Sequence, residues 1–128
     1  MIFFLILALP LNVDVVLAAN NTTNTSSVTT VQIVNAASRV DDLYKTNNRL
    51  PNYVTISGEQ VTMSQFLYLA ATGTSQINKG STASISVKTI STPTNSVENL
   101  TTGNIQKNEY VTLAESLENY MNTHGKSP

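Results

Sequence analysis

Two segments of the chain repeat each other, and this repeat restricts the possible folds more than any other feature of the sequence. Residues 37–51, ASRVDDLYKTNNRLP, align without a gap with residues 114–128, AESLENYMNTHGKSP, at an offset of 77 positions. The paired positions are alike in kind: Val34 with Val111, Ala37 with Ala114, Val40 with Leu117, Asp41 with Glu118, Thr46 with Thr123, Arg49 with Lys126 and Pro51 with Pro128. Any two amphipathic helices share an apolar stripe, but they do not share the polar end that follows here. The match therefore indicates a repeated structural unit.

The first copy begins with the pattern of an amphipathic helix over residues 31–47. Its apolar residues recur every three or four positions: Val31, Val34, Ala37, Val40, Leu43 and Tyr44. This spacing predicts one buried stripe. Thr29 or Thr30 suits the N-cap. Asn47–Asn48 suits the end of the helix, because Asn tolerates the left-handed conformation there.

A small hairpin and a second helix are predicted to follow. Val54 and Ile56 alternate with polar residues, Ser57–Gly58 supplies a turn, and Gln60–Val61 forms the return arm. Thr62, followed three residues later by Gln65, is a capping-box signature. The stripe expected on this second helix is Met63, Phe66, Leu67, Ala70, Thr74 and Ile77. At 100° per residue, Tyr68 lies about 200° from Phe66 and is predicted to be exposed.

The remaining segments complete the predicted fold. Ala83, Ile85 and Val87 alternate as in a strand, and residues 93–104 read as a linker. A last helix is predicted to begin near Asn108 and to end before Gly125, with the stripe Val111, Ala114, Leu117, Tyr120 and Met121. We therefore expect an α+β, mostly helical repeat module over residues 31–92, made of helix, short hairpin, helix and strand. The first helix of a second, truncated repeat follows over residues 105–128.

The amino terminus has the pattern of an export signal. Residues 2–9 form an apolar run that is too short to span a bilayer, which takes about 20 apolar residues. Val16–Leu17–Ala18 offers a small-residue cleavage site, so residues 1–18 are predicted to be a signal peptide. No Lys or Arg precedes the run, which departs from that pattern, and a buried terminal strand or helix is the alternative. Residues 19–30 read as a Thr/Ser/Asn-rich linker. The glycosylation candidates are Asn20, Asn21, Asn24 and Asn99.

Charge and cysteine content argue against several classes of protein. Seven basic and eight acidic residues leave a net charge of −1, which offers no basic surface to nucleic acid or to anionic lipid. The absence of Cys excludes a disulfide framework, a thiolate zinc site and a Cys nucleophile within these residues. We expect no nucleic-acid partner, no membrane contact by the mature chain, no metal and no cofactor.

Residues 37–69 resemble a pseudomurein-binding repeat. The family pattern is a helix, an N-G-R-L-P-N-Y-V-like turn, a short extended piece and a Q-F-L-Y-L helix. The matching positions here are Asn47, Asn48, Arg49, Leu50, Pro51, Asn52, Tyr53 and Val54, then Gln65, Phe66, Leu67, Tyr68 and Leu69. Asn48 replaces the usual Gly, and both residues suit a positive φ. The second copy keeps Gly125 at that place but has Lys126 and Ser127 instead of the Arg-Leu pair.

The resemblance implies an exported, non-catalytic binding module of methanogenic archaea whose walls contain pseudomurein. Such repeats occur on surface proteins and beside the Cys-His-Asp peptidase domain of pseudomurein endoisopeptidases. Because this chain has no Cys, that hydrolytic activity is not carried over, and we expect no enzyme. The expected location is the cell surface or cell wall, and the expected partner is the pseudomurein polymer. The alternatives are an adhesin or structural surface protein that meets other surface proteins, and the amino-terminal part of a wall hydrolase.

Candidate ligand residues cluster in the turn of the first copy. Arg49 can hold a carboxylate with two parallel hydrogen bonds, Asn52 offers a donor and an acceptor, and Tyr53 can stack on a sugar, with Tyr68 as a second candidate. The competing interpretation is that Leu50, Pro51 and Tyr53 shape and pack the turn. The lone His124 suits a helix carboxyl end better than catalysis. Three carboxylates could suggest a glycosidase, but solvated surface side chains are the favoured interpretation: Asp41, Asp42 and Glu59.

Overall fold

The computed structural model describes residues 26–94 and 106–128. The elements in chain order are β2 (Ser27–Val28), α2 (Thr30–Asn47), β3 (Tyr53–Ile56), β4 (Glu59–Thr62), α3 (Met63–Asn78), β5 (Ile85–Ser86) and α4 (Lys107–His124). The fold is a small α+β domain, as predicted. Its described residues form two antiparallel two-stranded sheets, the predicted hairpin β3–β4 and the additional pair β2–β5. The predicted signal peptide, Asn20, Asn21, Asn24, Asn99 and most of the linker over 93–104 lie outside the described residues.

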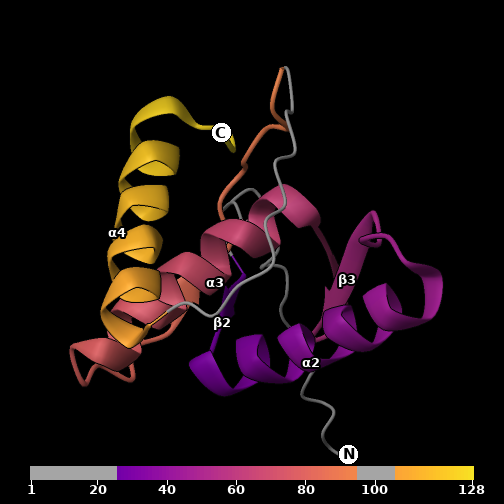
Figure 1. The fold of residues 1–128 in the computed structure, drawn as a ribbon, viewed down its shortest axis with the longest axis horizontal. Coiled ribbons are helices and arrows are strands. Elements are labelled where there is room, and N and C mark those ends of the chain that lie inside the picture. The colour runs from indigo at the N-terminus through magenta and orange to yellow at the C-terminus, as the bar shows by residue number, and fades with distance from the viewer. Residues whose placement is uncertain (1–25, 95–105) are drawn as a thin grey trace, which may run out of the picture.

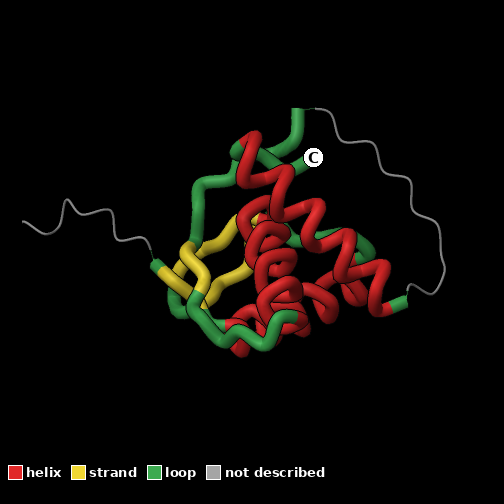
Figure 2. The backbone as a smooth tube through the Cα atoms, turned by 90° about the vertical axis from the view of Figure 1, so that its left-hand side faces the viewer, coloured by secondary structure: helices red, strands yellow, loops and turns green. Residues whose placement is uncertain are grey.

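Helix α3 forms the centre of the molecule. It lies between α2 and α4 and packs against both (Figure 1). The short strands lie together at one side of the helices (Figure 2). Among residues 26–94 and 106–128, the buried cluster takes side chains from α2, α3 and α4 and from both strand pairs, with Leu69 of α3 fully buried. A helix that packs against neighbours on several sides needs small or apolar residues on more than one face.

Helix α2 begins and ends where its capping residues predict. The Thr29 hydroxyl accepts a hydrogen bond from the Gln32 backbone N–H at 3.2 Å, and the Gln32 side chain accepts one from the Thr29 N–H at 2.8 Å. Asn48 closes the helix in the left-handed conformation, with φ of 59°, and its N–H donates to the Tyr44 carbonyl at 2.7 Å. The capping prediction is confirmed at both ends.

The buried face of α2 differs from the predicted stripe. The core side chains are Ile33, Ala36 and Val40, whereas Val31, Val34, Ala37, Leu43 and Tyr44 are exposed. A series spaced by three residues rotates by about 60° per step, so Val31 and Val34 point away from the face that contains Val40. The predicted stripe is therefore wrong except at Val40.

The hairpin β3–β4 forms as predicted. Val54 pairs with Val61, and both side chains are buried. Ser57 and Gly58 both have positive φ, 53° and 86°, which matches the twist that a two-residue hairpin turn needs. The hairpin leads directly into α3 through Thr62, whose hydroxyl accepts from the Gln65 N–H at 3.2 Å while the Gln65 side chain accepts from the Thr62 N–H at 3.0 Å. The predicted capping box is confirmed.

Helix α3 buries more than one stripe. Its buried side chains include Phe66, Tyr68, Leu69, Ala71 and Thr72, while Met63, Leu67 and Ala70 are half-buried and Ile77 is exposed. The predicted stripe is thus correct at Phe66 and wrong at Ile77. The single-stripe expectation assumed one packing partner, but α3 has α2 and the hairpin on one side and α4 on the other.

The start of the fold lies inside the segment predicted to be a linker. Val28 is buried and pairs with Ile85, which joins β2 to β5, and the Val87 N–H donates to the Ser26 carbonyl at 2.8 Å. Residues 26–30 of the predicted linker over 19–30 are therefore structured. Burial of Val28, the one large apolar residue in that polar segment, explains the difference.

Helix α4 packs on the first repeat. It begins after Gln106, close to the predicted start at Asn108. The Gln106 N–H donates to the Glu109 carboxylate at 3.4 Å, which caps this end of the helix. Gly125 ends it with φ of 67°, as predicted. Ser127 then fixes the end of the chain, since its N–H donates to the Ser91 carbonyl at 3.0 Å and its hydroxyl lies 3.1 Å from that of Ser64.

Candidate functional site

The turn between α2 and β3 forms one wall of a surface hollow of about 450 Å³, here called the corner hollow. Its lining residues are Arg39, Leu43, Asn47, Arg49, Leu50, Pro51, Asn52, Tyr53, Val54 and Thr55. They come from the last turns of α2, from the turn itself and from the first residues of β3. Three of the four predicted ligand residues, Arg49, Asn52 and Tyr53, thus lie at one place on the surface.

Backbone contacts hold this turn at both ends. The left-handed Asn48 stops α2 and directs the chain away from the helix axis. At the other end, the Asn52 carbonyl accepts a hydrogen bond from the Met63 N–H at 3.2 Å, and the buried Val54 anchors β3 in the core. Pro51 restricts the backbone between these two points. The side chains of the turn are therefore presented by a constrained backbone.

The polar groups of the turn face solvent. Arg49, Asn52 and Tyr53 are exposed, and Tyr53 retains 46% of its surface. Within the described residues the Arg49 guanidinium makes no ion pair. Its donors are therefore available to a ligand, and Tyr53 beside it offers an aromatic face and a hydroxyl. This geometry is compatible with contact to a ligand, and the core does not depend on these side chains for its packing.

Arg39 also lines the corner hollow, although the sequence did not indicate it as a candidate ligand residue. It lies on α2, is exposed, and donates a hydrogen bond from its guanidinium to the Thr55 carbonyl of β3. The chain contains only two arginines, and both line this hollow. None of the lining residues is acidic. The corner hollow consequently combines two guanidinium groups with a tyrosine and has no carboxylate in its lining.

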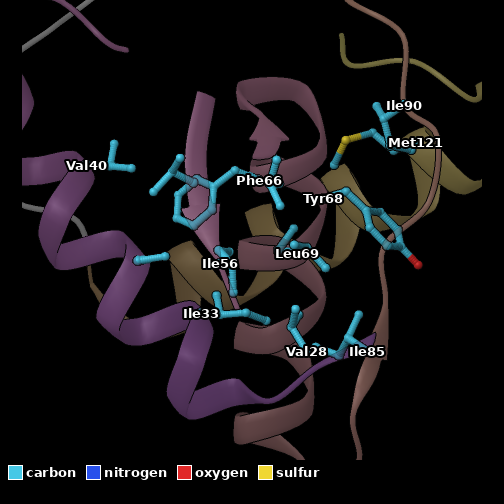
Figure 3. Packing of buried hydrophobic residues seen from close by; sticks show 14 of the residues in the cluster. Val28, Ile33, Val40, Ile56, Phe66, Tyr68, Leu69, Ile85, Ile90 and Met121 are labelled. Carbon is cyan, nitrogen blue, oxygen red and sulfur yellow. The ribbon is translucent and has the colours of Figure 1, made fainter. Parts of the chain in front are cut away.

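Tyr68 is not part of this site, which corrects the prediction that it is exposed and binds ligand. Only 5% of its surface is accessible. It projects from α3 toward Met121 and Ile90, whereas Phe66 points to the α2 side (Figure 3). Lys88 Nζ lies 5.2 Å from the centre of the Tyr68 ring and donates to Asn122 Oδ1 at 2.7 Å. The side opposite Phe66 is buried because α4 covers it.

Three of the four other titratable candidates have structural partners, and the fourth, Asp42, is exposed. Asp41 forms an ion pair with Lys45 at 2.6 Å. The pKa of Lys45 is raised mainly by its hydrogen bond to Asp41 and secondly by the negative charge of that carboxylate. Glu59 accepts from the Ser26 hydroxyl at 2.6 Å. His124 Nδ1 lies 2.9 Å from the Tyr120 carbonyl, and its ring stacks on Tyr120 with centroids 4.1 Å apart. These contacts agree with the interpretation of Asp41 and Glu59 as surface side chains and of His124 as a helix-end side chain.

Metal-binding and membrane-spanning features are both absent from the described ranges 26–94 and 106–128. No group of three His, Asp or Glu side chains there is placed to hold a metal ion. No helix in those ranges combines the length and the apolar character needed to cross a membrane.

Comparison of the chain with family models, with curated proteins and with solved structures gave no match.

Proposed function

We propose that the chain is an exported, non-catalytic module that binds the pseudomurein cell-wall polymer through the corner hollow and so anchors a surface protein. One observation carries this proposal: both arginines of the chain line one hollow, beside the exposed Tyr53 and Asn52, with no acidic lining residue. The pseudomurein-binding resemblance of residues 37–69 supports the choice of polymer.

The chemistry of the hollow favours a ligand that contains carboxylates and sugar rings. A guanidinium can bind a carboxylate with two parallel hydrogen bonds, and charge-assisted bonds of this kind are stronger than neutral ones. Arg39 already uses a donor on Thr55, so Arg49 is the principal carboxylate partner and Arg39 contributes charge. Tyr53 supplies a flat surface for a sugar, and the Asn52 amide supplies a donor and an acceptor.

The small size of the hollow implies modest affinity from a single module. A wall polymer presents many copies of its epitope, and linked repeats gain avidity through effective concentration. The second copy has Lys126 and the buried Ser127 where the first copy has Arg49 and Leu50. It therefore lacks the paired arginines, and the first copy is the binding unit in the proposal.

The proposal can be tested by retention of the complete chain on purified pseudomurein sacculi before and after their carboxyl groups are converted to amides. We expect retention on untreated sacculi and a loss of roughly tenfold or more after conversion, because bonds to charged groups contribute about 1.5–3 kcal/mol. Higher ionic strength should also weaken retention. Mock-treated sacculi are the control. Equal retention on amidated and mock-treated sacculi would contradict the proposal.

A further inference from the structure

Helices α2 and α4 each leave a second apolar face uncovered within the described residues. On α2 this outer face consists of Val34, Ala37 and Tyr44, and on α4 it consists of Tyr110 and Leu113. Leu117, at the border of that face, is partly buried and packs against the core cluster. Scattered apolar side chains are normal on protein surfaces. These residues are not scattered, because the internal repeat relates them to residues that are buried in the other helix.

The outer face of α2 corresponds to the core-facing side of α4. At the offset of 77 positions, Val34, Ala37 and Tyr44 match Val111, Ala114 and Met121, and those three side chains are the buried residues of α4. Val34 is 56% exposed, whereas Val111 is 9% exposed. Met121 is in the core beside α3 (Figure 3). The face that α4 uses to pack on α3 is therefore present on α2 but uncovered.

The relation also holds in the opposite direction. The core-facing residues of α2 are Ile33, Ala36 and Val40, and they match Tyr110, Leu113 and Leu117 of α4. Leu113 is 52% exposed, whereas its equivalent Ala36 is fully buried. In α2 this face packs against β3 and α3, with the Ile33 side chain beside Gly73. Each first helix thus carries two apolar faces, one equivalent to the core-facing side of α2 and one equivalent to the core-facing side of α4.

We infer that the outer face of α4 is a docking surface for a hairpin and second helix equivalent to β3, β4 and α3, so that successive repeats stack through shared first helices. The occupant follows from the structure, because the equivalent face of α2 is already covered by β3 and α3 in this chain. An array in which every first helix contacts second helices on both sides has the arrangement of a solenoid.

The hollow on the outer side of α2 agrees with this arrangement. It has a volume of about 680 Å³ and is lined by the outer-face residues Ala37 and Tyr44 together with Val40, Leu50 and Phe66, among others. In α4 the equivalents of Ala37, Val40 and Tyr44 pack toward α3. The hollow therefore lies on the side of α2 that is equivalent to the α3-facing side of α4. This hollow shares Arg49 and Leu50 with the corner hollow, whereas the outer face of α4 shares no residue with it. The inference about α4 therefore rests on the internal repeat and is independent of the proposed wall binding.

The test appends residues 52–128 of the same sequence after Pro128, a junction set by the match of Pro128 with Pro51. The chain has no Trp, so Tyr110→Trp provides a single fluorescent reporter on the outer face. In the extended chain we expect blue-shifted emission and a several-fold decrease in acrylamide quenching, relative to the same substitution in the 128-residue chain. Val31→Trp, whose position is exposed and belongs to neither repeat-facing side, is the matched control and should stay quenched in both lengths.

A second substitution links the shielding to the proposed contact. Leu113→Asp, at a position that is half exposed in the 128-residue chain, should restore full quenching of the reporter at position 110 in the extended chain. Equal quenching of that reporter in both lengths would overturn the inference. Shielding that appears in the shorter chain and increases with its concentration would also overturn it, because a second copy would then be the occupant.

Discussion

Replacing Tyr68 with Ala is expected to destabilise the domain by about 3–5 kcal/mol, as for other large aromatic residues removed from a core. The ring is buried between α3, α4 and the segment that contains Lys88 and Ile90. Its removal leaves a cavity and ends the contact with the Lys88 ammonium. A loss of this size is a large part of the roughly 5–15 kcal/mol that stabilises a typical domain. Urea unfolding followed by far-UV circular dichroism measures it.

The matched control is the same substitution at Tyr53. Because Tyr53 keeps almost half of its surface, Tyr53→Ala should change the free energy of unfolding by less than about 1 kcal/mol. Tyr68→Phe retains the ring and should also leave stability nearly unchanged. The structural role of Tyr68 would be contradicted if Tyr68→Ala unfolded at the same urea concentration as the parent chain.

The local signals in the sequence predict the ends of the elements well. The following predictions are all confirmed: the N-cap at Thr29, the capping box at Thr62, the Ser57–Gly58 turn and the left-handed residues Asn48 and Gly125. Each of these features depends on residues within about four positions of one another, so the information needed to place them is contained in the segment itself.

The faces of the helices could not be predicted in the same way. Helix α2 carries apolar residues on two faces, and periodicity alone does not say which one meets α3. The spacing therefore favours the stripe through Val31 and Val34, whereas the structure buries Ile33 and Ala36. In α3, periodicity predicts an exposed Tyr68 because it contains no information on the position of α4. Which face is buried depends on the tertiary partner, which lies in a different segment of the chain.

The candidate site also combines residues that local sequence signals predict with one residue that only the tertiary structure brings in. Arg49, Asn52 and Tyr53 are neighbours in the sequence, and the constrained turn keeps them together. Arg39 joins them only because β3 runs back along α2 and the Thr55 carbonyl accepts from the Arg39 guanidinium. Arg39 is separated from the turn by the end of α2, so no local sequence pattern predicts this contact. The one feature that could have indicated it is that the chain contains just two arginines.

Replacing Arg49 with Ala is expected to weaken retention on pseudomurein sacculi by about tenfold or more, because a charge-assisted hydrogen bond contributes roughly 1.5–3 kcal/mol. The free energy of unfolding should remain within about 0.5 kcal/mol of the parent, since the exposed guanidinium forms no ion pair in the described part of the chain. Arg49→Lys should recover only part of the loss, because an ammonium cannot form the parallel pair of hydrogen bonds. Sedimentation with sacculi at several protein concentrations gives the affinity.

Lys79→Ala is the matched control for net charge. Lys79 is exposed at the carboxyl end of α3 and does not line the corner hollow, so its replacement removes one positive charge elsewhere on the surface. We expect it to retain nearly the parent affinity. An equal loss for Lys79→Ala and Arg49→Ala would mean that retention depends on overall charge and that the corner hollow has no special role.

If the polymer binds in the corner hollow, its contact can be located there on the folded chain. Soluble pseudomurein fragments would be titrated into isotope-labelled protein while the backbone amide resonances are recorded. Binding through the corner hollow predicts that the largest shifts occur at residues 49–55 and around Arg39, with little change along α4. Shifts concentrated on the outer face of α4, or no saturable shift at residues 49–55, would contradict it.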